Sequence, residues 1–214
     1  MGRARDISKV FSTGTALATD TEVSGSYLTL ASASTTYQTK ATAGLTLLNT
    51  TSFTAQTTVS INDVFSATYD NYRIIINSNN STVSAQSNFL RMRVGGADNS
   101  SSNYRWSGSY IFDNSATPTV NGQASNGLGT SFYSGGSSST AGFTGAIVLD
   151  LSNPFATKHT SYTSLAYSYD QFGTRGGIDS QGGVMSVTTS YTGFTIVPNT
   201  GNITGTVSVY GYNK

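Results

Sequence analysis

Tyr72-Arg73-Ile74-Ile75-Ile76 is one of two continuous apolar runs in this chain, and Ala146-Ile147-Val148-Leu149 is the other. Short runs of this kind, rich in β-branched residues, are typical of strands that cross the centre of a β-sandwich. We therefore expect both segments to be central strands that are buried on both faces. In the rest of the chain Thr, Tyr and Val favour strands, whereas Gly and Asn favour the turns between them.

Ten stretches of the chain predict strands. They are Leu45–Leu48, Gln56–Ile61, Tyr72–Asn77, Phe89–Val94, Tyr104–Phe112, Phe143–Leu151, Ser161–Tyr169, Val184–Tyr191, Gly193–Val197 and Ile203–Tyr212. The pairs Gly176-Gly177 and Gly182-Gly183 are interpreted as turns, and the Gly/Ser-rich stretch Ser115–Ala141 as a long surface loop. Nine or ten short strands with frequent turns predict an all-β fold over residues 45–214, an antiparallel β-sandwich of the jelly-roll-like kind.

Composition and charge argue against several classes of protein. Charged residues are 10% of the 214, and the formal net charge is +1, so we do not expect the concentrated basic face of a nucleic-acid-binding protein. The absence of cysteine excludes disulfides and thiolate metal sites. No stretch approaches the ~18 apolar residues of a transmembrane helix, and Met1–Lys9 lacks the apolar run of a signal peptide. We therefore expect a protein made in the cytoplasm that does not insert into a membrane.

Ser24–Ala43 is a tandem repeat in which Ser, Tyr, Thr and Ala recur every ten residues. This period aligns Tyr27 with Tyr37 in an extended chain, and equally in short helical turns joined by bends, and both conformations remain open. The segment has too little apolar surface to fold alone, so residues 24–44 are interpreted as an oligomerisation neck. Its contacts are assigned to Tyr27, Leu28, Leu30 and Tyr37.

Residues 1–23 are interpreted as a docking segment. Ile7, Val10 and Phe11 have the i, i+3, i+4 spacing of one face of a short helix. These three side chains would insert into a larger assembly, while Arg3 and Arg5 would pair with its acidic residues. The alternative is a frayed terminus without a function.

The stretch Met1–Val10, the stretch Thr15–Val23 and the Tyr-containing repeat together resemble the N-terminus of tail-fibre and other appendage proteins of tailed bacteriophages. The closing stretch Gly205–Tyr212 is also similar to the ends of such proteins. The resemblance implies that the N-terminus attaches to other virion proteins, that the C-terminal part faces outward, and that the chain forms a homotrimer. It also implies a location on the virion, exposed once particles leave the host cytoplasm.

Residues for catalysis are sparse. His159 is the only histidine, and the chain has no cysteine. It therefore has few of the residues from which a catalytic Ser-His-Asp triad or a transition-metal site is built. A glycosidase needs two carboxylates ~5–9.5 Å apart, and the acids after residue 44 are seven scattered aspartates: Asp63, Asp70, Asp98, Asp113, Asp150, Asp170 and Asp179. Gly95-Gly96-Ala97-Asp98 has groups that bind calcium, but such a stretch is more often a simple turn. We expect no enzymatic activity, no metal and no cofactor.

Aromatic residues beside polar ones supply candidates for glycan binding. They are Tyr104, Arg105, Trp106, Tyr110, Phe132 and Tyr133. Aromatic faces stack on the CH groups of sugars, while amides and hydroxyls bind the sugar oxygens. The alternative is that these aromatic residues belong to the core or to a subunit interface, and for Trp106 this alternative is the more common one in a β-sandwich.

The sequence therefore predicts a structural virion appendage. The first hypothesis is a short tail fibre that attaches through its N-terminus and presents the sandwich as a head for glycans on the host surface. The second is a capsid decoration or head-fibre protein that stabilises the shell without binding a receptor.

Overall fold

The fold is that of a computed structural model, which describes residues 44–80, 86–112, 119–125, 127–137, 145–169 and 176–214. In this part of the chain there are thirteen strands and no helix. The predicted docking segment lies outside the described residues, and so does the repeat neck except for Gly44. The same is true of the side chains assigned to them: Arg3, Arg5, Ile7, Val10, Phe11, Tyr27, Leu28, Leu30 and Tyr37.

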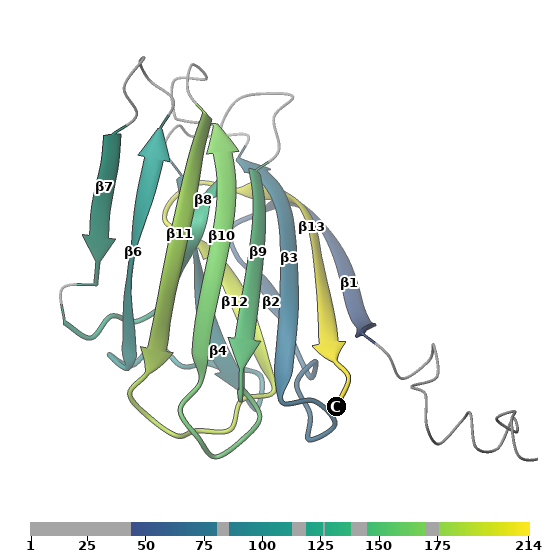
Figure 1. The fold of residues 1–214 in the computed structure, drawn as a ribbon. Coiled ribbons are helices and arrows are strands. Elements are labelled where there is room, and N and C mark those ends of the chain that lie inside the picture. Colours follow the sequence, from purple (N-terminus) through teal and green to yellow (C-terminus); the bar gives the residue numbers. More distant parts are fainter. Residues whose placement is uncertain (1–43, 81–85, 113–118, 126, 138–144, 170–175) are drawn as a thin grey trace, which may run out of the picture. The chain divides into compact units, whose positions relative to one another are not determined.

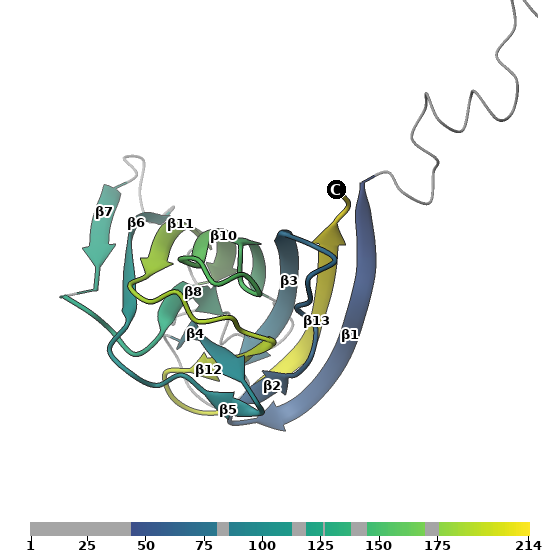
Figure 2. The ribbon, with the colours of Figure 1, turned by 90° about the horizontal axis from the view of Figure 1, so that it is seen from below.

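The described strands form two antiparallel sheets that lie face to face (Figures 1 and 2). The larger sheet has eight strands, in the order β1 (Leu45–Gln56), β13 (Ile203–Tyr212), β3 (Asn71–Asn80), β9 (Gly145–Ser152), β10 (Ser161–Tyr169), β11 (Gly176–Met185), β6 (Tyr104–Phe112) and β7 (Thr119–Ala124). The smaller sheet contains β2 (Val59–Ile61), β12 (Gly193–Pro198), β4 (Gln86–Val94) and β5 (Ala97–Asp98), and β8 (Phe132–Ser137) also pairs with β4. The prediction of an all-β antiparallel sandwich is confirmed.

The first and last strands of the sandwich are neighbours. β1 pairs with β13 from Leu45 opposite Tyr212 to Gln56 opposite Ile203. Nested inside this pair along the chain, β2 pairs with β12 in the smaller sheet. Early strands paired with late ones in this nested way are the pattern of a rolled antiparallel ribbon, as in a jelly roll. The C-terminal strand β13 thus lies between β1 and β3 and connects β1 to the rest of the larger sheet (Figure 1).

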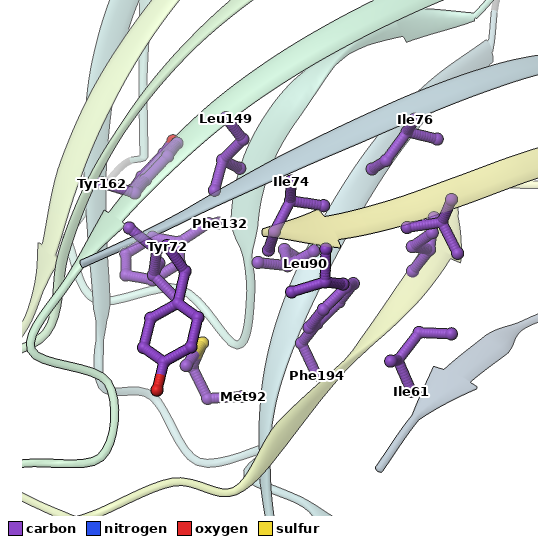
Figure 3. Close-up of a cluster of buried hydrophobic side chains, with 14 of the residues drawn as sticks. Ile61, Tyr72, Ile74, Ile76, Leu90, Met92, Phe132, Leu149, Tyr162 and Phe194 are labelled. Carbon is purple, nitrogen blue, oxygen red and sulfur yellow. The ribbon is translucent and has the colours of Figure 1, made fainter. Parts of the chain in front are cut away.

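The core lies between the sheets and takes every second residue of the central strands. In β3, Ile74 and Ile76 are fully buried, whereas Ile75 between them is only half-buried. Leu149 of β9 and Phe194 of β12 belong to the same buried cluster (Figure 3). The expectation that both apolar runs are buried on both faces is therefore wrong for the outer face, because a two-layer sandwich covers one face of each sheet.

Strand β11 corrects the interpretation of its two glycine pairs as turns. Gly176-Gly177 and Gly182-Gly183 all lie within this strand, and the strand predicted over Val184–Tyr191 ends at Met185. Close packing explains the glycine at position 183, since a Cβ there would lie 2.1 Å from the carbonyl oxygen of Arg105 in β6. Glycine inside a strand often marks such a close backbone approach.

The stretch Ser115–Ala141 is also corrected. Its described residues contribute β7 to the edge of the larger sheet and β8 to the smaller one. Phe132 and Ser134 of β8 are fully buried. A Gly/Ser-rich composition predicted a surface loop, but the two aromatic side chains of β8, Phe132 and Tyr133, pack into the core.

Candidate binding site

Three of the six predicted glycan-binding residues are part of the core. Tyr104, Phe132 and Tyr133 are buried, and the rings of Tyr104 and Phe132 meet edge to face with their centroids 4.8 Å apart. The hydroxyl of Tyr104 accepts a hydrogen bond from the Met92 N–H at 2.9 Å and donates one to the Asn99 carbonyl at 2.7 Å. These three ring faces are not available to a sugar, so their assignment to glycan binding is corrected.

Trp106 and Tyr110 are four residues apart in β6, so their side chains lie on the same face of the strand. Both are half-buried. The Trp106 indole stacks on the Tyr133 ring at a centroid distance of 5.2 Å and an interplanar angle of 27°. One face of the indole is therefore already covered by the protein. Arg105, the residue before Trp106, is exposed, because successive side chains of a strand point to opposite faces of the sheet.

Arg105 and Trp106 border an open pocket of about 310 Å³. Its other lining residues are Ser107, Ser125, Gly127, Gly182, Gly183 and Val184. In the pairing of β6 with β11, Gly182 lies opposite Ser107 and Val184 lies opposite Arg105. Because Gly182 has no side chain, room is left beside Ser107 on the outer face of the sheet.

The pocket offers mainly hydrogen-bonding groups. The Arg105 guanidinium carries five N–H donors, and the Ser107 hydroxyl can donate or accept. The Ser125 hydroxyl already bonds the Gly127 carbonyl at 3.0 Å. None of the eight lining residues carries a carboxylate, so this lining does not supply the carboxylate pair of a glycosidase. Its donors suit a polyhydroxylated or anionic ligand.

Asp150 is held by an ion pair on the outer face of the larger sheet. Arg73 donates two hydrogen bonds to its carboxylate, at 2.9 and 2.7 Å, and the Tyr212 hydroxyl donates a third at 2.7 Å. The Arg73 guanidinium holds the pKa of Asp150 below its ordinary value. This carboxylate therefore remains ionised and stabilises the contact between β3, β9 and β13.

Asp98, the carboxylate of the calcium hypothesis, is also engaged within the fold. Gly95 and Gly96 have φ values of 58° and 79°, the left-handed pair typical of a tight hairpin turn, and they reverse the chain from β4 into β5. Asp98 then pairs with Arg93 and accepts a hydrogen bond from the Thr195 hydroxyl at 2.6 Å. The stretch is a hairpin turn closed by an ion pair, in agreement with the more common interpretation given to it from the sequence.

Asp179 differs from these two aspartates because it is buried on the inner face of β11. Its carboxylate accepts hydrogen bonds from the Gly136 N–H at 2.9 Å and from the Tyr133 hydroxyl at 3.3 Å. Burial raises the pKa of Asp179 above its ordinary value, and these two hydrogen bonds offset only part of the rise. Burial also raises the pKa of Tyr133, to about 12, with the neighbouring Asp179 charge adding to the effect.

Among the described residues, no group of three or more His, Asp or Glu side chains is placed to hold a metal ion. No helix in this part of the chain is long and apolar enough to cross a membrane. The pocket beside Arg105 is taken as the candidate site because two of the predicted residues, Arg105 and Trp106, line it. No protein-family model matches the chain, and neither a curated protein nor a solved structure matches it.

Proposed function

We propose that the chain is a structural subunit of a tailed-bacteriophage virion, a short tail fibre that attaches through residues 1–23 and carries the sandwich as its head. The observation that carries the proposal is the division of the chain. Gly44–Lys214 is one compact unit, and it begins directly after the residues that resemble the attachment end of phage appendage proteins. The other resembling stretch, Gly205–Tyr212, lies within β13, the last strand of the head.

Identical copies would associate through the neck of residues 24–44 into a homotrimer. A Ser/Thr/Ala-rich repeat of this kind gains a defined structure only by packing against partners. Three heads on one trimer would also gain avidity for a repeated surface, even if each site binds weakly.

Recognition of a host glycan is the finer part of the proposal, and the pocket beside Arg105 and Trp106 is the site that supports it. The burial of Tyr104, Phe132 and Tyr133 removes half of the predicted sugar-binding residues. This observation favours the second candidate, a capsid decoration or head-fibre protein whose head needs no receptor.

Deleting Met1–Phe11 is expected to leave a folded head that no longer joins phage particles, because Ile7, Val10 and Phe11 are the proposed anchors. The measurement is the amount of the protein in purified particles that are assembled with the deleted chain. Circular dichroism of the purified chain checks that its β structure is unchanged.

A matched control replaces Ser8 and Ser12 with alanine, which changes the same region but keeps its apolar and basic residues. Normal incorporation of the chain without Met1–Phe11 would contradict the docking assignment. Cryo-electron microscopy of particles that carry the intact chain then separates the two candidates, since it shows whether the head sits on the tail or on the capsid.

A further inference from the structure

Five large apolar side chains form one patch on the outer face of the eight-stranded sheet. The patch consists of Ile111, Val120, Leu165, Tyr167 and Ile178, which are between 37% and 64% exposed. Four of them are direct cross-strand neighbours: Tyr167 lies opposite Ile178, Ile178 opposite Ile111, and Ile111 opposite Val120. Leu165 lies two residues before Tyr167 on β10 and therefore on the same face.

Along the strands, polar residues or glycine follow the patch. Moving along the strands, the outward positions next to it are Thr163 on β10, Ser180 on β11, Ser109 on β6 and Gly122 on β7. An antiparallel sheet with a solvated face normally places polar residues there, and this sheet does so at these four positions, although Ile75 and Val148 continue the row of Leu165 as outward apolar side chains. Contiguous apolar patches of this kind on soluble proteins mark interaction sites.

Charge limits what can cover the patch. The row through Tyr167 and the row through Leu165 cross all eight strands without a charged side chain. A polyanionic partner such as a nucleic acid would find no cation in these rows. A second copy of the chain would bring an equally neutral and apolar patch, and the formal net charge of +1 opposes self-association only weakly.

We propose that this patch packs against the same patch of other copies of the chain at their symmetry axis, so that the outer face of the larger sheet is a subunit interface. The inference deepens the proposed assembly of identical chains and rests on it for the identity of the occupant. A standard interface buries about 800 Å² on each partner. The five side chains would form its apolar centre, and the Ser, Thr and Asn residues of the same two rows would form its polar rim.

The first experiment removes the apolar surface without disturbing the strands. The triple variant Val120→Thr, Tyr167→Thr and Ile178→Thr keeps residues that favour strands. In the full chain it should weaken self-association by roughly tenfold or more, measured by sedimentation velocity over a range of concentrations. The matched control is Val94→Thr in β4 of the smaller sheet, which removes an exposed apolar side chain (44% exposed) away from the proposed interface and should associate like the parent chain.

The second experiment measures proximity directly and does not depend on the triple variant folding. The chain has no cysteine, so Ile178→Cys in the full chain gives a unique position for a spin label, and Val94→Cys gives the control position. Labels at position 178 should show strong dipolar coupling between copies, while labels at position 94 should show weak coupling.

Three results would overturn the proposal. One is an oligomer in which the label at position 178 is uncoupled and exposed to solvent. Another is a monomer in which this label is shielded, because the chain's own N-terminal region would then cover the patch. The third is shielding only on the particle, which would identify another virion protein as the occupant. The particle-incorporation test of the proposed function is independent of all three, so either proposal can fail alone.

Discussion

Tyr104→Phe is expected to lower the free energy of unfolding by about 2–4 kcal/mol, although it removes a single oxygen atom. That hydroxyl accepts from the Met92 N–H at 2.9 Å and donates to the Asn99 carbonyl at 2.7 Å, inside a fully buried site. It therefore joins β6 of the larger sheet to β4 of the smaller one. Without it, both backbone groups lose this partner, and the Met92 N–H is buried away from water.

Urea unfolding at one fixed protein concentration measures this effect, with the slope of the transition checked for equality between the chains. Tyr167→Phe is the matched control. It removes the hydroxyl of a half-exposed tyrosine and should change the free energy of unfolding by less than about 0.5 kcal/mol. If the two variants unfold alike, the hydroxyl of Tyr104 is not the bridge between the sheets that the geometry indicates.

Asp179→Asn is expected to raise the stability of the head at neutral pH. An amide has nearly the shape of the carboxyl group and keeps an acceptor for the Gly136 N–H and the Tyr133 hydroxyl. It does not carry the negative charge that burial penalises in Asp179. The gain comes from removing an ionisable group whose charged form is unfavourable in the folded state.

The pH dependence of this gain has a definite sign. The pKa of Asp179 is raised in the folded protein, above its value of about 3.9 in an unfolded chain. The stability that the protonated group contributes is complete below the unfolded pKa and is lost as the pH rises through the folded pKa. The curves of unfolding free energy for parent and variant should therefore coincide in acid and separate as the pH rises, with the variant above.

Asp150→Asn is the control, for which the expected change in unfolding free energy at neutral pH has the opposite sign. Arg73 lowers the pKa of Asp150, so the stability that this carboxylate contributes is present above its unfolded pKa and is lost as the pH falls. The Asp150→Asn chain should be less stable than the parent at neutral pH and approach it in acid. Equal stability of the Asp179→Asn chain and the parent at every pH would show that Asp179 is not penalised by burial.

Segments with strong alternation of apolar and polar residues could be predicted from the sequence. The bounds predicted for β6, β10 and β13 agree with those in the structure: Tyr104–Phe112, Ser161–Tyr169 and Ile203–Tyr212. In these stretches local propensity and the two-residue period both favour a strand. The sandwich architecture follows from their number and from the turns between them.

Strands whose residue types are determined by packing against distant parts of the chain could not be predicted in this way. Gly183 favours a turn in isolation, but in β11 it is glycine because the Arg105 carbonyl lies too close for a Cβ. Phe132 lies among glycines and serines, and its burial in β8 comes from rings on other strands, Tyr104 and Tyr162. Both effects depend on residues far away along the chain, which a local pattern does not contain.

The candidate site shows the same limit. Arg105 and Trp106 could be singled out because a cation and an aromatic residue stand together in the sequence. The other wall of the pocket, Gly182 and Val184, becomes visible only through the register of β11 on β6. Tyr104 and Tyr133 have the composition of a sugar-binding site, but the alternation of β6 and the position of β8 direct their rings into the core.

The contact between the two ends of the head has a mechanical consequence. The Asn213 N–H bonds the Gly44 carbonyl at 3.0 Å, and β1 runs antiparallel to β13 from that corner. Tension between Gly44 and the C-terminus would peel the two strands apart, breaking their hydrogen bonds one at a time. A pull between Gly44 and the far end of β13, near Ile203, would instead load the bonds in shear, so that all of them resist together. A head attached at Gly44 should therefore resist unfolding best when the force acts on the end of β13 near Ile203.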